Sequence, residues 1–152
     1  MGTMLMIQIN PIILNKLLTQ LKDVKIIYVG LIGSRFWKES HEYSDWDFIA
    51  IIESDVDLFT SWKQDNLNIH YWGFTNFKTA LAYSNPLAWE WLNYSQEVLG
   101  KKPDLNYLVD TYALFKKLEY NIKKEFGDKN LTAKQLKWKN RYLKFISKLN
   151  IH

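Results

Sequence analysis

Two apolar segments with the character of β-strands, residues 26–32 and 48–52, enclose a polar stretch of this chain. The first reads IIYVGLI and the second FIAII. Because an unbroken apolar run indicates a strand buried on both faces, the second segment predicts the central strand of a sheet. The polar stretch opens with Gly33-Ser34 and closes with Asp45-Trp46-Asp47. Small and acidic residues are therefore expected together at the ends of neighbouring strands.

Asp45 and Asp47 are spaced to share a cation. Side chains alternate between the two faces of a strand, so these two carboxylates project to the same side. Neighbouring carboxylates repel each other unless a metal ion or a proton neutralises them, and ligand sets made only of oxygen favour Mg²⁺, with Mn²⁺ as a substitute. The alternative is a pair of solvated acids at the start of a strand, which is the more common meaning of an isolated Asp-x-Asp.

The residues that follow the first apolar segment are suited to phosphate. Gly33 permits a tight turn and a close approach to the backbone, while Ser34 adds a hydroxyl and an exposed N–H. Arg35 could reach a triphosphate, and a surface role is equally consistent with its position. A phosphate-holding turn that faces a metal-holding pair is what phosphoryl or nucleotidyl transfer requires, because that chemistry depends mostly on positioning and charge neutralisation.

The spacing of these residues resembles the signature of the DNA polymerase β-like nucleotidyltransferase superfamily. Gly33-Ser34 is followed by ten residues and then by Asp45-x-Asp47 at the start of an apolar strand. This stretch aligns without a gap with the GSRAYG...SDYD form found in predicted nucleotidyltransferases of bacteria and phages, including an RNA-repair-associated group. The resemblance implies that Asp45 and Asp47 hold the metal and that Gly33 and Ser34 hold the β- and γ-phosphates of an NTP.

A second segment, residues 84–92, resembles the SNP...EWL segment of that same group. It reads SNPLAWEWL and contains Glu90 between two tryptophans. We interpret Glu90 as structural, holding a basic residue or a backbone amide. Together the two matches cover roughly residues 26–100.

The chain departs from the superfamily pattern at the position of the third carboxylate. Members usually carry it on the next core strand, and here the position falls on Asn68, with His70 two residues further. An Asn carbonyl can coordinate a cation but supplies no charge and no general base. Two functions therefore stay open. The first is a Mg²⁺-dependent nucleotidyltransferase that acts on an acceptor hydroxyl, with Asn68 completing the site. The second is a catalytically degraded module, antitoxin-like or binding RNA or nucleotide.

The length and composition indicate one globular domain. The chain has 152 residues, of which 47% are hydrophobic, and this is enough for a substantial core. No apolar run approaches the 18 residues of a membrane span, and the N-terminus lacks the pattern of a signal peptide, so we expect a cytoplasmic protein without membrane contact. Cysteine is absent, which excludes disulfides and Cys-based zinc sites. With only three histidines, a His-rich metal site is not expected either.

The charge is distributed unevenly along the chain. Residues 1–100 contain 7 Lys and Arg and 11 Asp and Glu, a net charge of −4, whereas residues 101–152 contain 13 and 5, a net charge of +8. We therefore predict a nucleotidyltransferase-like core over 1–100 and a basic helical extension packed on it over 101–152. The extension could bind an RNA or protein acceptor. The alternative is a set of solvated lysines on amphipathic helices.

The overall prediction is an α/β fold, with a small mixed β-sheet, helices packed on it and a helical C-terminal half. Asn10-Pro11 and Asn85-Pro86 match the cap and first position of a helix. In the final helices, Tyr112 and Leu136 are expected on the buried side. The remaining elements are strands at 24–32, 47–53 and 66–72, helices at 11–21, 75–83, 87–91, 105–126 and 132–149, a helical turn at 58–63 and a helix stop at Gly100.

Overall fold

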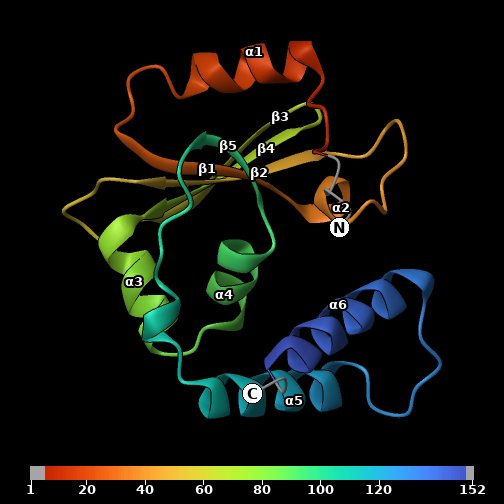
Figure 1. The fold of residues 1–152 in the computed structure, drawn as a ribbon. Helices are drawn as coiled ribbons and strands as arrows, with labels where there is room; N and C mark the ends of the chain where they lie inside the picture. Colours follow the sequence, from red (N-terminus) through yellow and green to blue (C-terminus); the bar gives the residue numbers. More distant parts are fainter. Residues whose placement is uncertain (1–5, 150–152) are drawn as a thin grey trace.

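A mixed sheet with helices on both faces forms the centre of the computed structural model, which describes residues 6–149 (Figure 1). The strand order is β3-β4-β2-β1-β5. Strands β2 and β4 are parallel, and the other neighbouring strands are antiparallel. The predicted α/β fold is confirmed. The strands are β1 (Ile26–Ile32), β2 (Trp46–Ile52), β3 (Phe59–Gln64), β4 (Leu67–Gly73) and β5 (Gln96–Gly100).

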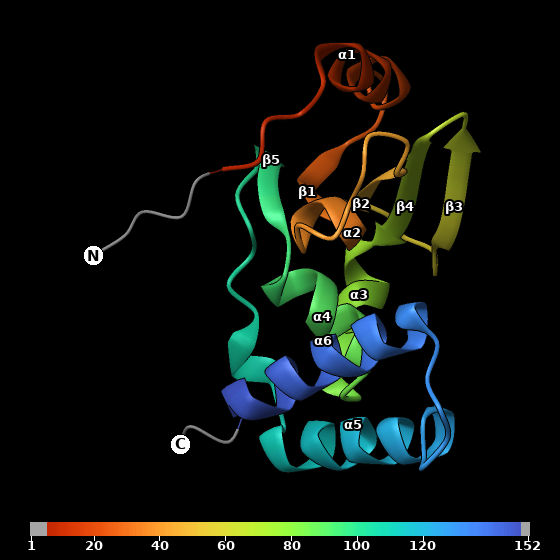
Figure 2. The ribbon, with the colours of Figure 1, turned by 90° about the vertical axis from the view of Figure 1, so that its right-hand side faces the viewer.

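The helices divide between the two faces of the sheet. Helix α1 (Pro11–Gln20) covers one face, and α3 (Phe74–Ala82) and α4 (Pro86–Asn93) lie on the other (Figures 1 and 2). Helices α5 (Thr111–Glu125) and α6 (Ala133–Leu149) lie beyond α3 and α4, and the short α2 (Gly33–Phe36) follows β1. Residues of α5 and α6, such as Leu114 and Phe145, share one hydrophobic cluster with Ile49 of the sheet. The C-terminal helices are therefore packed on the sheet layer.

The alternation along β2 explains which face each side chain occupies. Phe48 and Ala50 belong to the cluster under α1, whereas Ile49 and Ile51 belong to the cluster under the other helices. All of β2 from Phe48 onward is buried, as the apolar run predicts. Because the period is two residues, Asp47 shares the face of Ile49 and points toward the side of the sheet where α4 and α6 lie.

Both predicted helix caps are present. The Asn10 side chain accepts hydrogen bonds from two backbone amides at the start of α1, and Asn85 does the same for α4. Each Asn is followed by a Pro at the first helical position, whose missing N–H leaves no donor to satisfy.

Two predicted elements are wrong because the residues are paired in the sheet. Residues 58–63 form most of β3 rather than a helical turn, and β3 joins β4 through the two residues Asp65 and Asn66, with Asp65 at φ 53°. As an edge strand, β3 is largely exposed and needs no apolar alternation. Gly100 ends β5 and not a helix. Its φ is +67°, and a side chain there would collide with the carbonyl of Ile27 on β1.

The C-terminal helices differ from the prediction in start and in orientation. Helix α5 begins at Thr111, capped by the Asp110 side chain, after a 3-10 turn at Asn106–Leu108 (η1). Tyr112 is 71% exposed, and the buried residues of α5 are Leu114 and Leu118. Leu136 of α6 is 49% exposed, because the helix turns Arg141 and Phe145 inward. A buried Arg occupies a core position of α6, and the apolar pattern alone does not predict this.

Within residues 6–149, none of the helices has the length and apolar character needed to cross a bilayer.

Candidate functional site

Asp45, Asp47 and Asn68 meet at one end of the two parallel central strands. Asp45 lies just before β2 and Asp47 within it, and the register pairs Asp47 with Asn68 on β4. The Asn68 amide nitrogen donates to Asp47 Oδ1 at 2.7 Å and to Asp45 Oδ2 at 3.3 Å. Two carboxylate oxygens therefore converge on a single donor. The structure thus brings together the acid pair and the residue at the predicted third position.

Gly33 lies directly against the acid pair. Antiparallel pairing sets Ile32, the last residue of β1, opposite Asp47, so the next residue is beside the carboxylate. A Cβ built on Gly33 would lie 2.7 Å from Asp47 Oδ2, and the residue has φ +74°. Both facts require glycine, since a side chain would strain the backbone and displace Asp47. The small-residue turn and the acids therefore face each other as the sequence predicts.

Two further polar side chains from the β3–β4 hairpin contact the acids. Lys63 Nζ lies 3.2 Å from Asp45 Oδ2, with both side chains well exposed. His70 Nε2 lies 4.0 Å from Asp47 Oδ1, and its Nδ1 forms a 2.7 Å hydrogen bond with Ser61 Oγ. Burial lowers the pKa of His70, although the Asp47 carboxylate opposes the shift. The imidazole facing Asp47 is therefore neutral at pH 7.

Arg35 is directed elsewhere. Its guanidinium donates to the backbone carbonyls of Ser44 at 2.9 Å and Glu42 at 3.3 Å, and it lies 4.2 Å from the centre of the Trp46 ring. These contacts hold the loop between α2 and β2. Phosphate binding by Arg35 stays a prediction, and in this structure its side chain has a structural role.

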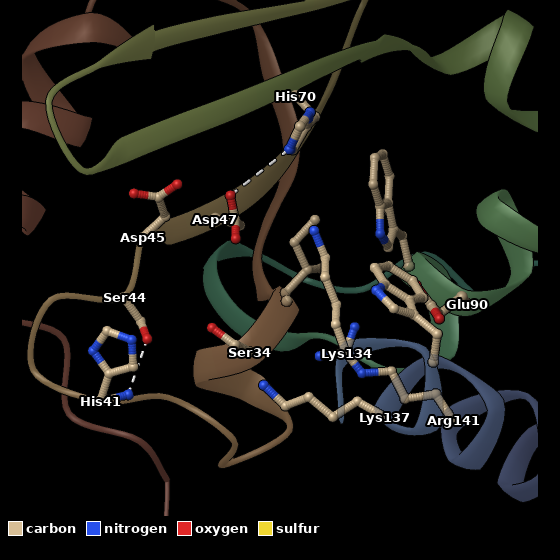
Figure 3. Close-up of a pocket in the computed structure, with 14 residues that line it drawn as sticks. Ser34, His41, Ser44, Asp45, Asp47, His70, Glu90, Lys134, Lys137 and Arg141 are labelled. Carbon is tan, nitrogen blue, oxygen red and sulfur yellow. Dashed lines mark hydrogen bonds and ion pairs between the residues drawn. The ribbon is translucent and has the colours of Figure 1, made fainter. Parts of the chain in front are cut away.

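The acids and the turn line a cavity of about 610 Å³ whose opposite side is helix α6 (Figure 3). We call Asp45 and Asp47 the acidic wall, and Lys134, Lys137 and Arg141 the basic wall. In Figure 3 the basic side chains extend from α6 on the side opposite His70 and the acids. The remaining lining residues are Ile32, Gly33, Ser34, His41, Ser44, His70, Glu90, Trp91 and Trp138.

The ion pair of a buried arginine attaches the basic wall to the rest of the site. Arg141, whose side chain is 7% exposed, donates from Nη2 and Nε to Glu39 Oε1 at 2.6 and 3.2 Å. Lys137 Nζ donates to the Glu39 carbonyl at 3.4 Å. Glu39 follows α2, so these contacts fix α6 over the turn that carries Gly33. The link joins segments 102 residues apart.

Glu90 on α4 is the buried acid of the cavity. Burial raises its pKa to about 7, and the nearby Arg141 opposes the shift. The carboxyl is therefore divided between its neutral and ionised forms near neutral pH. The proximity of Arg141 agrees with the predicted structural role of Glu90 beside a basic residue.

The residues of α6 are the part of the cavity that the sequence motifs did not identify. One signal was available, because α6 carries six basic residues and no acidic one within AKQLKWKNRYLKFISKL. That composition makes α6 strongly positive but does not indicate where the helix lies. The position over the acids depends on tertiary contacts such as Arg141 with Glu39.

The donor set fits a magnesium ion that is shared with a substrate. Mg²⁺ is commonly held by one or two carboxylates, with phosphate oxygens and water completing the shell. The converging oxygens of Asp45 and Asp47 supply two such ligands, at the point where the Asn68 amide now donates. Within residues 6–149 there is no group of three or more His, Cys, Asp or Glu that could hold a metal by itself. The substrate would therefore have to contribute ligands.

Comparison with protein-family models gives no match for this chain, and comparison with curated proteins gives no significant one. The function of the protein is therefore inferred from the geometry of the cavity.

Proposed function

We propose that this protein is a Mg²⁺-dependent nucleotidyltransferase, which moves a nucleoside monophosphate from an NTP to an acceptor hydroxyl of RNA or protein and releases pyrophosphate. The observation that carries the proposal is the cavity of about 610 Å³ between the acidic wall and the basic wall. A triphosphate carries several negative charges and needs cations on more than one side. A metal held by the acids would meet that need on one side, and the lysines of α6 would meet it on the other.

Each residue has a role consistent with its position. Asp45 and Asp47 would hold Mg²⁺, which when bound neutralises phosphate charge and polarises the reacting phosphate. Gly33 and Ser34 would lie against the β- and γ-phosphates, with Lys134 and Lys137 on the opposite side. The acceptor oxygen forms a bond to the α-phosphorus while the bond to pyrophosphate breaks. His70 lines the same cavity and can accept the hydroxyl proton at Nε2 when its Nδ1 donates to Ser61.

The test compares two Asp-x-Asp pairs of this chain. The double variant Asp45→Asn/Asp47→Asn should abolish Mg²⁺-dependent transfer of label from an α-labelled NTP to an RNA or protein pool. The matched control is Asp55→Asn/Asp57→Asn, because both of these acids are exposed in the loop after β2 and lie outside the cavity. Transfer that persists in the first variant, or is lost equally in both, would overturn the assignment.

A second function is favoured by the polar contacts of the acidic wall. The Asn68 amide and the Lys63 ammonium already offset the charge of the acidic wall without a metal. A binding module with a degraded site would have this arrangement, since Asn68 adds neither charge nor a base. NTP binding is measured by thermal shift with and without Mg²⁺. Saturable binding without label transfer would support the module over the enzyme.

A further inference from the structure

The basic residues of α6 form one row along the helix. Five of its six basic residues follow a spacing of three and four, and we call these the cationic row. At 3.6 residues per turn they fall within an arc of about 80°, roughly one per turn. Lys139 alone lies off this arc. The members of the cationic row are Lys134, Lys137, Arg141, Lys144 and Lys148.

The row extends beyond the cavity. Lys134, Lys137 and Arg141 line the cavity, whereas Lys144 and Lys148 do not. Lys148 is 14 residues from Lys134, about 21 Å along the helix axis. A single triphosphate held at the acids cannot contact cations over that length. The outer lysines therefore require a longer polyanion.

Aromatic rings support the outer part of the row. Trp37 and Tyr94 are stacked, with centroids 4.8 Å apart. Lys144 Nζ lies 5.6 Å from the centre of the Trp37 ring, and Lys148 Nζ lies 5.2 Å from that of Tyr94. Contacts with ring faces orient the ammonium groups without neutralising them.

In the described part of the chain, the lysines of the row form no ion pair with an acid, whereas Arg141 is paired with Glu39. Lys102 adds to the charge at the far end. Burial lowers the pKa of Lys102, and the charge of Lys148 lowers it further, while Glu97 opposes the shift. Anions that reach this end of α6 would therefore relieve repulsion between cations.

We infer that the cationic row binds the phosphates of a single-stranded nucleic acid whose terminal hydroxyl enters the cavity as acceptor. This inference rests on the proposed nucleotidyltransferase function, which it makes specific. A single strand supplies regularly spaced negative charges and ends in a hydroxyl on the same chain. A duplex is too wide for a cavity of about 610 Å³. An acidic protein offers no such regular match to one cation per turn.

The experiment uses the two lysines outside the cavity. Binding of a labelled oligouridylate of about 12 nucleotides is measured by fluorescence anisotropy over a range of salt concentrations. The variant Lys144→Ala/Lys148→Ala should weaken binding about tenfold and reduce the slope of log affinity against log salt by about 1.4, since each contact to a single strand contributes about 0.7. Both side chains are exposed, so the fold should be retained.

The matched control removes the same charge from another helix. Lys123→Ala/Lys124→Ala on α5 alters two exposed lysines away from the row and should leave affinity within about twofold. Equal weakening in both variants would overturn the inference. So would equal affinity for a duplex of the same sequence, or displacement of the oligonucleotide by polyglutamate at equal charge.

The failure of this inference can be separated from the failure of the proposed function. Row-dependent oligonucleotide binding without label transfer would retain the surface and reject the enzyme. Transfer to a protein acceptor, without row-dependent oligonucleotide binding, would retain the enzyme and reject the surface. Transfer to the oligonucleotide that is lost in Lys144→Ala/Lys148→Ala, with NTP binding by thermal shift unchanged, supports both.

Discussion

The acidic wall and the basic wall of the cavity are held in place in different ways. Asp45 and Asp47 are fixed by strand pairing, since the register sets Asp47 beside Asn68 on one side and Ile32 on the other. The basic wall depends on the docking of α6, in which Phe145 enters the hydrophobic cluster and Arg141 forms an ion pair with Glu39. The sheet therefore determines the geometry of the acids locally, while the position of the cations depends on how α6 docks.

The largest expected effect comes from breaking the contact that docks the basic wall. Arg141→Met keeps much of the side-chain volume but leaves the Glu39 carboxylate without its ion-pair partner. Removing one partner of a buried pair costs about 3–5 kcal/mol. We expect a loss of at least about 3 kcal/mol in the free energy of unfolding, measured with urea. Lys139→Met, on the same helix but off the row, is the control. A loss below about 1 kcal/mol for Arg141→Met would show that α6 is docked by other contacts.

The pH dependence of stability tests the environment of Glu90 between the walls. Its folded pKa of about 7 exceeds the ordinary glutamate value of 4.5, so the folded state binds the proton more tightly. The stabilisation is complete below about pH 4.5 and is lost as the pH rises through about 7. The charged and titratable groups that face Glu90 are Arg141, Tyr94 and Tyr142.

Glu90→Gln should remove this dependence. Relative to Glu90→Gln, the wild type should lose about 3 kcal/mol of unfolding free energy between about pH 4.5 and about pH 8. Urea unfolding of both proteins across this range measures the difference, in which other titrating groups largely cancel. Parallel curves for the two proteins would contradict the raised pKa.

Adding a third acid sharpens the contrast on the acidic wall. Asn68→Asp removes a donor shared by two carboxylates and adds a like charge. Without metal, the variant should be destabilised by about 2 kcal/mol, since bonds to charged groups are worth about 1.5–3 kcal/mol. Mg²⁺ should restore that stability and shift the melting temperature of the variant more than that of the wild type.

The control for charge alone is Asn106→Asp, at an exposed position of η1 remote from the acids. If Mg²⁺ stabilises Asn68→Asp no more than it stabilises this control, Asp45 and Asp47 do not form a metal site.

The smallest difference between a variant and its control is expected at the turn against the acids. Gly33→Ala and Gly127→Ala both place a side chain at positive φ, +74° and +44° respectively. The new Cβ at position 33 would lie 2.7 Å from Asp47 Oδ2, whereas the nearest atom to a Cβ at position 127 is 3.6 Å away. Each should lose about 1–2 kcal/mol to backbone strain. Gly33→Ala should lose about 1 kcal/mol more and should also reduce the Mg²⁺–NTP thermal shift. Equal behaviour of the two variants would mean that Asp47 moves aside without consequence.

The strands that carry the acids were predictable because their pattern is local. The apolar runs at 26–32 and 48–52 and the caps at Asn10 and Asn85 each identify their element without help from the rest of the chain. Edge strands β3 and β5 were not predicted, because they are strands only through pairing with β4 and β1. Strand β3 is mostly exposed, and β5 is short and only partly buried. Their identity is a property of the sheet and not of their own residues.

The candidate site follows the same division. Gly33, Ser34, Asp45 and Asp47 could be grouped from their spacing and from strand alternation, whereas Asn68 was added by the superfamily pattern that the chain resembles. The direction of Arg35 toward the Ser44 carbonyl could not, because it depends on the path of the loop. The burial of Arg141 was also hidden, since a basic residue on a basic helix is expected to be solvated.

The ion pair of Glu39 with Arg141 also determines when the cavity can exist during synthesis. Glu39 and Arg141 are 102 residues apart in the sequence. The segment that carries Asp45 and Asp47 is therefore translated well before α6. A nascent chain can therefore pair its central strands while the opposite side of the cavity is still unmade. Closing a loop of this length costs entropy that grows only slowly with its size, so α6 can complete the cavity after the sheet has formed at little additional cost.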